Sequence, residues 1–157
     1  MSRILLVLAL FVMVSVTSAA QPWLGVWTNS EKAPENWDQF VAALGLPLEQ
    51  FSGNPKATIT ITRDDGDNYK VLLDVPAINF TSTWNLRLGE EMVMDEFGSG
   101  MRYNFTEDGD KLQAHVKISA IGKQYNENYE VVGQELIITY KMDGIVAKRF
   151  LKRDQSS

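Results

Sequence analysis

Turn-forming residues recur at short intervals along most of the chain, and this spacing limits the fold more than any other feature. Glycines, several of them beside aspartate, separate a series of short runs. Asp-Gly pairs favour the positive φ angles of tight β-hairpins. The runs alternate apolar and polar residues, as in Ala57–Thr62, which is the period of a strand with one buried face. Nine such runs between Ala57 and Arg153, with a tenth at Gly25–Ser30, predict ten antiparallel strands.

A helical pattern interrupts this series once, between the first and second predicted strands. Apolar residues recur there at helical spacing within Pro34–Gly45, namely Trp37, Phe40, Val41 and Leu44. That spacing predicts an amphipathic helix that ends at Gly45. Leu46–Phe51 has room for a second helical turn. A helical pair followed by a meander predicts an all-β fold. It is a ten-stranded antiparallel up-and-down barrel, capped by a short helix-turn-helix between its first two strands.

Residues 1–20 are organised like a secretory signal peptide. Arg3 precedes an apolar run at Ile4–Val14, and the small residues Ser18 and Ala20 stand at the −3 and −1 positions of a cleavage site. The apolar run is shorter than the roughly 20 residues that span a bilayer. We therefore expect cleavage before Gln21, export of residues 21–157 as one domain, and an extracellular location for the mature protein.

The composition excludes several kinds of chemistry. The 157 residues contain no cysteine and one histidine, His115. Thiol catalysis, thiolate zinc sites and sites with several histidines are therefore excluded. The acidic segment Asp64–Asp67 lacks the spaced ligands of a calcium loop, so it is interpreted as a hairpin turn. The net charge of −5 does not favour a nucleic-acid partner. We expect no cofactor, no bound metal and no enzymatic activity.

Three segments of the predicted mature chain form a recognisable signature. They are Gly25-Val26-Trp27 with Asn36-Trp37-Asp38-Gln39-Phe40-Val41-Ala42-Ala43-Leu44-Gly45, then Thr81-Ser82-Thr83-Trp84-Asn85-Leu86-Arg87-Leu88-Gly89-Glu90-Glu91, and Asp143-Gly144-Ile145-Val146-Ala147-Lys148-Arg149-Phe150. In this order the chain resembles the fatty-acid-binding proteins, or intracellular lipid-binding proteins. The resemblance implies a flattened ten-stranded barrel with a helix-turn-helix lid, in a family that carries long-chain fatty acids, retinoids or bile salts.

The chain departs from the pattern of that family in three places. The link around Ala33–Glu35 is slightly longer, the region Leu46–Pro55 is slightly shorter, and most family members lack a signal peptide. The resemblance therefore implies an exported variant.

Arg149 lies in the last predicted strand, Ile145–Leu151. Strand alternation places Arg149 opposite Lys148 and Lys152, so it faces the barrel interior if those lysines face solvent. The reverse parity puts Phe150 inside and Arg149 outside. A guanidinium in the interior needs an anion or polar partners, and a fatty-acid carboxylate can pair with it bidentately. The resemblance implies this carboxylate-binding role for Arg149.

The resemblance also implies an altered headgroup site. Members of the family often hold the carboxylate with two arginines and a tyrosine. Arg149 matches the arginine of the last strand, Tyr129 falls near the position of the other arginine, and Leu151 stands where the tyrosine would be. Tyr129 can still donate its phenol hydrogen to a carboxylate. Because the cationic donors are fewer, the headgroup of the ligand and its pose stay open.

A set of large apolar residues on the later strands allows two interpretations. They are Trp84, Leu86, Met92, Met94, Tyr103, Phe105 and Ile118. Side chains fill most small barrels, whereas ten strands leave room for a ligand. Methionine among aromatic rings suits a flexible chain and is also common as core filler. The resemblance favours a lined cavity, with Trp84, Tyr103 and Met92 as ligand contacts.

Two N-glycosylation sequons occur, at Asn79-Phe80-Thr81 and at Asn104-Phe105-Thr106. Export would make both usable. Asn79 follows Pro76-Ala77 in a predicted turn and is the better acceptor, while the alternation of its strand places Asn104 on an outward face. The alternative is chance occurrence without a glycan.

Together these features predict a secreted, monomeric carrier of a long-chain fatty acid or a similar hydrophobic ligand. Arg149 is expected to hold the carboxylate, with transient membrane contact during ligand transfer. A lipocalin-like carrier of a retinoid, sterol or pheromone is the main alternative, because the Gly25-x-Trp27 pattern is shared with lipocalins. A lipid isomerase or hydrolase is a weaker alternative, because no Ser-His-acid pattern, thiol or metal cluster supports it.

Overall fold

Ten β-strands account for most of the computed structural model, which describes residues 21–45, 54–94 and 100–155. The strands are β1 (Gly25–Asn29), β2 (Thr58–Asp65), β3 (Asn68–Val75), β4 (Phe80–Arg87), β5 (Glu91–Met94), β6 (Met101–Asp108), β7 (Lys111–Ile118), β8 (Lys123–Val132), β9 (Glu135–Met142) and β10 (Ile145–Arg153). The nine runs after Ala57 and the run at Gly25–Ser30 all form strands, so the prediction of ten strands is confirmed.

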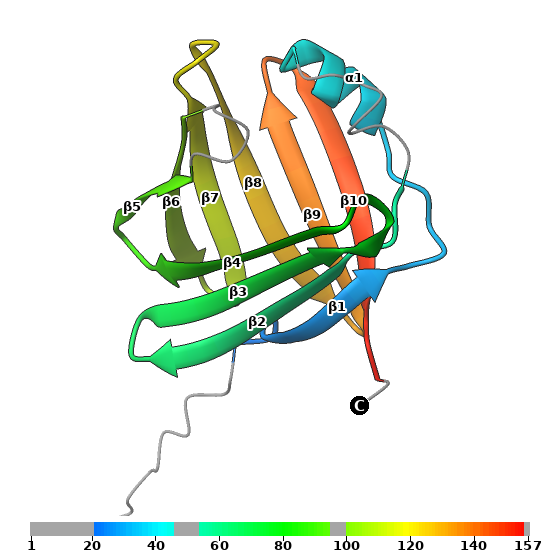
Figure 1. The fold of residues 1–157 in the computed structure, drawn as a ribbon, viewed down its shortest axis with the longest axis vertical. Helices are drawn as coiled ribbons and strands as arrows, with labels where there is room; N and C mark the ends of the chain where they lie inside the picture. The colour runs from blue at the N-terminus through cyan, green and yellow to red at the C-terminus, as the bar shows by residue number, and fades with distance from the viewer. Residues whose placement is uncertain (1–20, 46–53, 95–99, 156–157) are drawn as a thin grey trace, which may run out of the picture.

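The strands form one antiparallel sheet that curves into a nearly closed barrel (Figure 1). Pairing of β1 with β10 joins the first and last strands, with Trp27 opposite Arg153. The ends of the sheet are β4 and β5. The turn between β4 and β5 forms hydrogen bonds with other parts of the sheet. The Leu88 N–H donates to the Asp67 carbonyl at 3.2 Å, and the Gly89 N–H donates to the Phe105 carbonyl at 2.8 Å. The described barrel therefore stays open between β4 and β5, where complete closure was expected.

Most of the hairpin turns form where the sequence predicted them. Gly66, Gly109 and Gly144 have φ angles of +57°, +62° and +82°, which glycine adopts without the steric penalty of a side chain. The β7–β8 turn at Gly122 carried no sequence signal that was recognised, although its φ is +63°. Between β3 and β4 the chain forms a short 3-10 helix, η1 (Pro76–Ile78), at the predicted Pro-Ala turn.

One helix, α1 (Trp37–Ala43), lies between β1 and β2. It begins later than the expected Pro34, because Glu35 pairs with Lys148 of β10 as an isolated β-bridge. Asn36 then turns the chain with φ 51°, and its side-chain amide donates to the Val146 carbonyl at 3.0 Å. The predicted second helical turn at Leu46–Phe51 lies outside the described residues. The structure therefore describes one cap helix at this end of the barrel (Figure 1).

The end of the barrel opposite α1 is closed by tryptophan. Trp23 and Trp27 are both fully buried, and the Trp27 indole N–H donates to the Trp23 carbonyl at 3.0 Å. The Arg153 guanidinium donates to the carbonyls of Leu24 and Pro22 at 2.9 and 2.6 Å. These contacts join β1 and the end of β10 around two fully buried tryptophans.

Candidate functional site in the barrel interior

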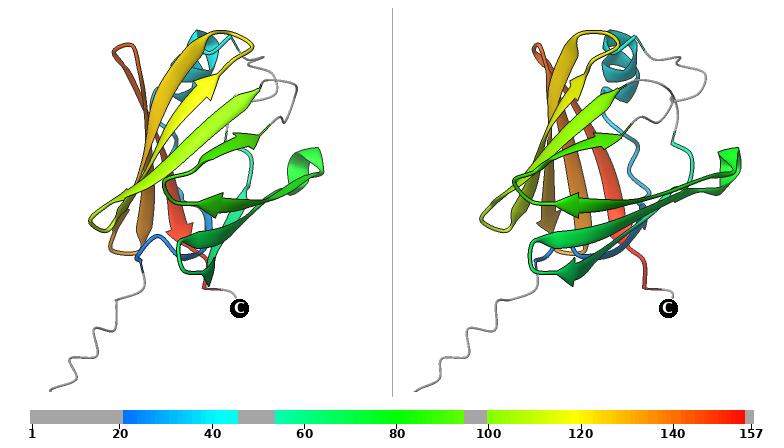
Figure 2. Two further views of the ribbon diagram at one scale, coloured as in Figure 1. Left: turned by 90° about the vertical axis from the view of Figure 1, so that its left-hand side faces the viewer. Right: turned by 60° about the vertical axis from the view of Figure 1, so that its left-hand side comes forward.

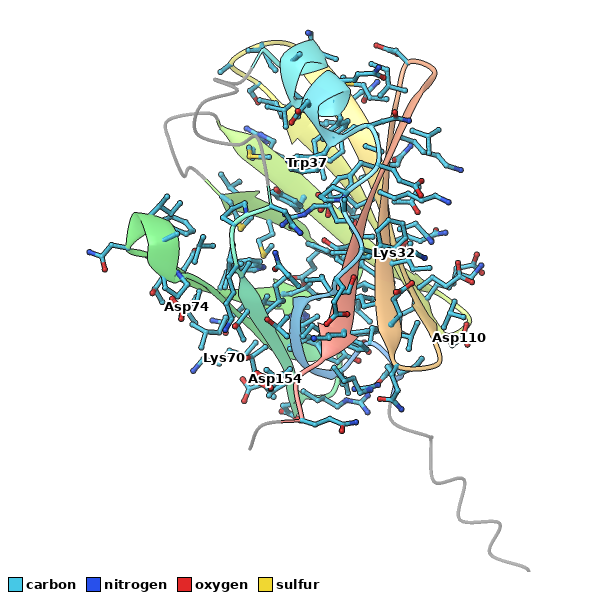
Figure 3. All side chains as sticks on the ribbon, turned by 90° about the vertical axis from the view of Figure 1, so that its right-hand side faces the viewer. Lys32, Trp37, Lys70, Asp74, Asp110 and Asp154 are labelled. Atoms are coloured by element: carbon cyan, nitrogen blue, oxygen red, sulfur yellow. The ribbon has the colours of Figure 1, made fainter. Side chains whose placement is uncertain are left out.

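Arg149 lies on the inward face of β10, between Ala147, which is fully buried, and Leu151, which is 2% exposed. Its guanidinium lies 5.0 Å from the ring centre of Trp37 on α1. Figure 3 shows Trp37 beneath α1, toward the barrel. Of the two parities that the sequence left open, the structure has the one with Arg149 on the inner face. The role of Arg149 in binding a ligand stays a prediction.

Phe150, the residue of opposite parity, is also buried, at 6% exposed. The link from β1 to α1 covers it on the outer face, where the Lys32 ammonium lies 4.5 Å from the ring centre and the Ser30 N–H donates to the Phe150 carbonyl at 3.2 Å. The burial of Phe150 therefore comes from a covering loop and does not reverse the parity of the strand.

A buried acid lies on the same inner wall, two strands away from this arginine, and sequence reasoning missed it. Glu127 of β8 is 6% exposed and accepts hydrogen bonds from two tyrosine hydroxyls of its own strand. Tyr125 donates to Oε1 at 3.1 Å and Tyr129 donates to Oε2 at 2.5 Å. In the β8–β9 register Glu127 stands opposite Tyr140. The alternation of Tyr125, Glu127 and Tyr129 along β8 was the signal that could have revealed this cluster.

Burial controls the protonation of this cluster, which we call the Glu127–tyrosine cluster and define as Tyr125, Glu127, Tyr129 and Tyr140. Burial raises the pKa of Glu127 above the usual range, and the hydrogen bonds from Tyr129 and Tyr125 oppose that increase. Burial also raises the pKa of Tyr140. The charge of Glu127 raises that pKa further, while Arg149 lowers it. Tyr140 is thus influenced by both the acid and the arginine.

These contacts change what Tyr129 and Leu151 can do. The hydroxyl hydrogen of Tyr129 is used by Glu127, so a ligand carboxylate would compete with Glu127 for it. Leu151 is 2% exposed and pairs with the fully buried Leu136. Leu151 occupies the position at which fatty-acid-binding proteins often have a tyrosine, and here it packs in the apolar core.

The predicted lining residues fall into two groups. Tyr103, Phe105, Leu86 and Ile118 are each less than 9% exposed, and the rings of Tyr103 and Phe105 stack at 5.7 Å. The second group is only half-buried and consists of Trp84, Met92 and Met94 on β4 and β5. The indole nitrogen of Trp84 is buried without a hydrogen-bond partner among the described residues. The inner wall is therefore tightly packed on one side and looser beside the β4–β5 opening.

The two sequons lie at different kinds of positions. Asn79 is exposed and follows η1 with φ 50°, and Figure 2 shows η1 at the tip of a projecting hairpin. Asn104 is exposed in the middle of β6. Both side chains are accessible for modification, and glycan occupancy stays a prediction.

The described residues contain no group of three or more histidine, aspartate or glutamate side chains that could hold a metal ion. His115 is half-buried on the outer face of β7, 2.8 Å from Asn126 Oδ1 and 3.1 Å from Gln124 Oε1. Within the same residues, no helix is long and apolar enough to cross a bilayer.

Comparison with known proteins assigns the chain to a family. No protein-family model matches it. The chain is 39% identical over 164 residues to secretory-abundant heat soluble protein 68234 of a Hypsibius species, covering 98% of this chain and 93% of that protein. It is 38% identical over 135 residues to secretory-abundant heat soluble protein 1 of Ramazzottius varieornatus, covering 86% and 79%. The chain belongs to the secretory-abundant heat soluble protein family.

Secretory-abundant heat soluble proteins share this fold with the fatty-acid-binding proteins. A crystal structure of one from Ramazzottius varieornatus matches with a TM-score of 0.78 at 38% identity, covering 84% of this chain and 95% of that one. The human intestinal fatty acid-binding protein is 26% identical over 129 residues, covering 76% of this chain and 91% of that protein. The resemblance to fatty-acid-binding proteins is therefore confirmed. The relatives are named as secretory proteins, which confirms the expected export.

Proposed function

We propose that this protein is a secreted carrier that holds a long-chain fatty acid or a similar hydrophobic molecule inside its barrel. The observation that carries the proposal is Arg149, an inward arginine beneath α1 in a barrel whose β4–β5 wall is only half-buried. Support also comes from the relatives, because one is named as an intestinal fatty acid-binding protein. Trp84, Met92 and Tyr103 are the proposed contacts of the apolar chain.

The affinity has two proposed sources. Burial of the ligand chain contributes about 0.8 kcal/mol per methylene and is insensitive to the headgroup. Arg149 contributes orientation, because a guanidinium can form two parallel hydrogen bonds with a carboxylate. Tyr129 can assist only when its hydroxyl leaves Glu127.

Replacement of Arg149 tests this division. We expect Arg149→Gln to weaken oleate binding by about 1.5–3 kcal/mol, the contribution of a hydrogen bond to a charged group. Binding of oleyl alcohol should change little, because the chain is still buried. Lys152→Gln is the matched control, since it removes the same charge from the exposed face of β10. Equal oleate affinity for wild type and Arg149→Gln in calorimetry would exclude Arg149 as the headgroup ligand.

Binding without catalysis is the role that we propose for the interior. If the ligand is not a fatty acid, the alternative is a lipocalin-like carrier of another hydrophobic molecule. If the protein is a catalyst, the alternative is a lipid isomerase or hydrolase. Mass spectrometry of the intact secreted protein under native conditions tests both. We expect a monomer that carries a co-purified fatty acid of unchanged mass. A chemically altered lipid would favour the enzyme.

Transient contact with a membrane is the proposed route of ligand transfer. We expect a fluorescent fatty acid to move from the protein to phosphatidylcholine vesicles at a rate that rises with vesicle concentration. A rate independent of vesicle concentration would indicate release into water instead.

Processing of the chain is part of the proposal. We propose cleavage of residues 1–20, so that the mature protein begins at Gln21. Intact-mass analysis of secreted material would contradict this if residues 1–20 were retained.

We also propose a glycan on exposed Asn79, with Asn104 as the second acceptor. Glycosidase treatment should shift the mobility of the wild type, and Asn79→Gln should lose the main shift.

Heat solubility is a second property that the names of the relatives suggest for this chain. We propose it on physical grounds as well. The chain has no cysteine, so heating cannot produce mixed disulfides, and its net charge of −5 disfavours association of unfolded chains. Centrifugation after heating should leave the protein in the supernatant at neutral pH, and precipitation there would contradict the proposal.

A further inference from the structure

Glu127 is a buried carboxyl group that the proposed function does not use. Both of its oxygens accept tyrosine hydrogen bonds, at 3.1 Å from Tyr125 and at 2.5 Å from Tyr129. An ionised carboxylate has about four acceptor positions and no donor. Among the described residues, two positions therefore stay available, and they suit a hydrogen-bond donor on a bound molecule. A second carboxylate brought near Glu127 would instead be repelled.

The surroundings of Glu127 provide little to offset its charge. Across β7 it stands opposite Ala114, and across β9 it stands opposite Tyr140. Tyr103 of β6 also faces this part of the interior. The one cation among the described residues that acts on the Glu127–tyrosine cluster is Arg149 of β10, through Tyr140. The α1 side chain that packs here is aromatic: the ring centre of Phe40 lies 5.1 Å from that of Tyr125 and 5.2 Å from that of Tyr140.

Arg149 and Glu127 therefore lie on the same inner wall with Tyr140 between them, on strands that flank β9. Neighbouring strands are about 4.8 Å apart, so a ligand group held by Arg149 lies within electrostatic reach of Glu127. Arg149 favours a carboxylate, and Glu127 disfavours it.

We propose that Glu127 determines ligand specificity by accepting a hydrogen bond from an amino or hydroxyl group of a long-chain lipid, most strongly from a protonated amine, and by opposing a carboxylate. This inference rests on the proposed function, because the hydrocarbon chain of the lipid must enter the barrel. A lipid that carries an acid at one position and an amino or hydroxyl group at another would satisfy both Arg149 and Glu127.

The inference predicts opposite effects of pH on two charged ligands. A carboxylate ligand binds better when Glu127 is protonated, so its affinity falls as the pH rises. A protonated amine binds better when Glu127 is ionised, so its affinity rises with pH. Burial raises the pKa of Glu127, and between about pH 6 and pH 8.5 the acid and amine ligands keep their own charges.

Three ligands with the same chain, namely dodecanoate, dodecanol and dodecylamine, provide the experiment. Calorimetry would compare wild type, Glu127→Gln and the control Glu130→Gln, which removes an acid paired with Lys111 on the outer face of β8. At pH 7.5 we expect Glu127→Gln to lower the affinity for dodecylamine about tenfold and to raise the affinity for dodecanoate by up to about tenfold. Dodecanol should change less than about threefold, and Glu130→Gln should match wild type.

The outcomes separate this inference from the proposed function. Parallel shifts of all three affinities in Glu127→Gln would overturn it, and so would wild-type pH profiles of equal sign for acid and amine between about pH 6 and pH 8.5. The wild-type profiles need no variant, so a poorly folded Glu127→Gln protein does not prevent the test. Failure of all three ligands to bind wild type would overturn the carrier function as well.

Discussion

Arg149 and Arg153 lie on the inward face of the same strand, β10, and each stacks on a tryptophan. At the closed end, Arg153 lies 4.3 Å from the ring centre of Trp27 and donates to two backbone carbonyls. At the end capped by α1, Arg149 lies 5.0 Å from the ring centre of Trp37 and borders the pair of Tyr140 and Glu127. Backbone carbonyls give Arg153 a structural role, whereas the neighbours of Arg149 are aromatic and titratable side chains, which is consistent with the ligand-binding role that we propose for it.

The surroundings of the two tryptophans differ in the same way. Trp27 is fully buried and donates to a carbonyl, while Trp37 is half-buried on a helix of seven residues. Tight packing supports stability at the end near Trp27, and the half-buried Trp37 marks a looser end. If the proposed carrier function is correct, stability and ligand entry are separated along the barrel axis.

The strongest test of the contrast removes each tryptophan in turn. Trp27→Ala should lower the free energy of unfolding by about 4 kcal/mol, because it creates a cavity in a fully buried site. Trp37→Ala should lower it by about half as much, because part of that ring already contacts solvent. Urea denaturation at neutral pH would measure both, and equal losses would contradict the separation.

Gly25 offers a second test at the closed end. Its φ is +126°, and an added Cβ would lie 2.8 Å from Arg153 Nη1. Gly25→Ala should therefore destabilise the protein by about 2–3 kcal/mol, through backbone strain and displacement of Arg153. Gly45→Ala, which follows α1 and has φ +73° with open space around it, should lose about 1 kcal/mol. Thermal or urea unfolding of the pair would show whether close packing adds to the strain.

The dependence of stability on pH tests the buried acid of the capped end. Because the pKa of Glu127 is raised in the folded state, its protonated form is favoured there. The associated stability is fully present below the ordinary carboxyl pKa and is lost as the pH rises through the folded pKa. The loss from pH 4 to pH 8 should be smaller in Glu127→Gln by on the order of 1 kcal/mol. Identical pH profiles of unfolding for the two proteins would mean that Glu127 keeps its usual pKa.

The smallest expected effect concerns the attachment of α1. The Lys123 ammonium donates to the Ala43 carbonyl at the end of α1, where a cation also interacts favourably with the helix dipole. Lys123→Met should cost about 0.3–1 kcal/mol. Hydrogen exchange should accelerate in α1 and stay unchanged around Trp27. Faster exchange at both ends would show that the two regions open together.

Local patterns account for the parts of the fold that were predicted. Alternation along each strand identified ten strands, because successive side chains of a strand point to opposite faces. Alternation left two parities open for Arg149, and the family resemblance favoured the inward one. Asp-Gly pairs identified three of the hairpins, at Gly66, Gly109 and Gly144, for an equally local reason, their tolerance of positive φ. The helix was predicted from the spacing of Trp37, Phe40 and Leu44, although the pairing of Glu35 with Lys148 delayed its start.

The candidate site was predicted only in part. Alternation alone put Tyr125, Glu127 and Tyr129 on one face of β8, but a glutamate on a strand is normally placed toward solvent. The same pattern allowed Arg153 to face inward, and alternation did not separate its role from that of Arg149. The carbonyls that bind Arg153 come from residues far away in the chain, Pro22 and Leu24.

The sequence by itself determined the strand series, the early helix and which residues of β10 share a face, because these depend on periods of two and of 3.6 residues along the chain. The tertiary structure alone decided which of two inward arginines donates to backbone carbonyls, that Glu127 is buried among tyrosines, and that the described sheet stays open between β4 and β5. Each of these depends on which distant residues meet when the sheet curves, and no local period contains that information.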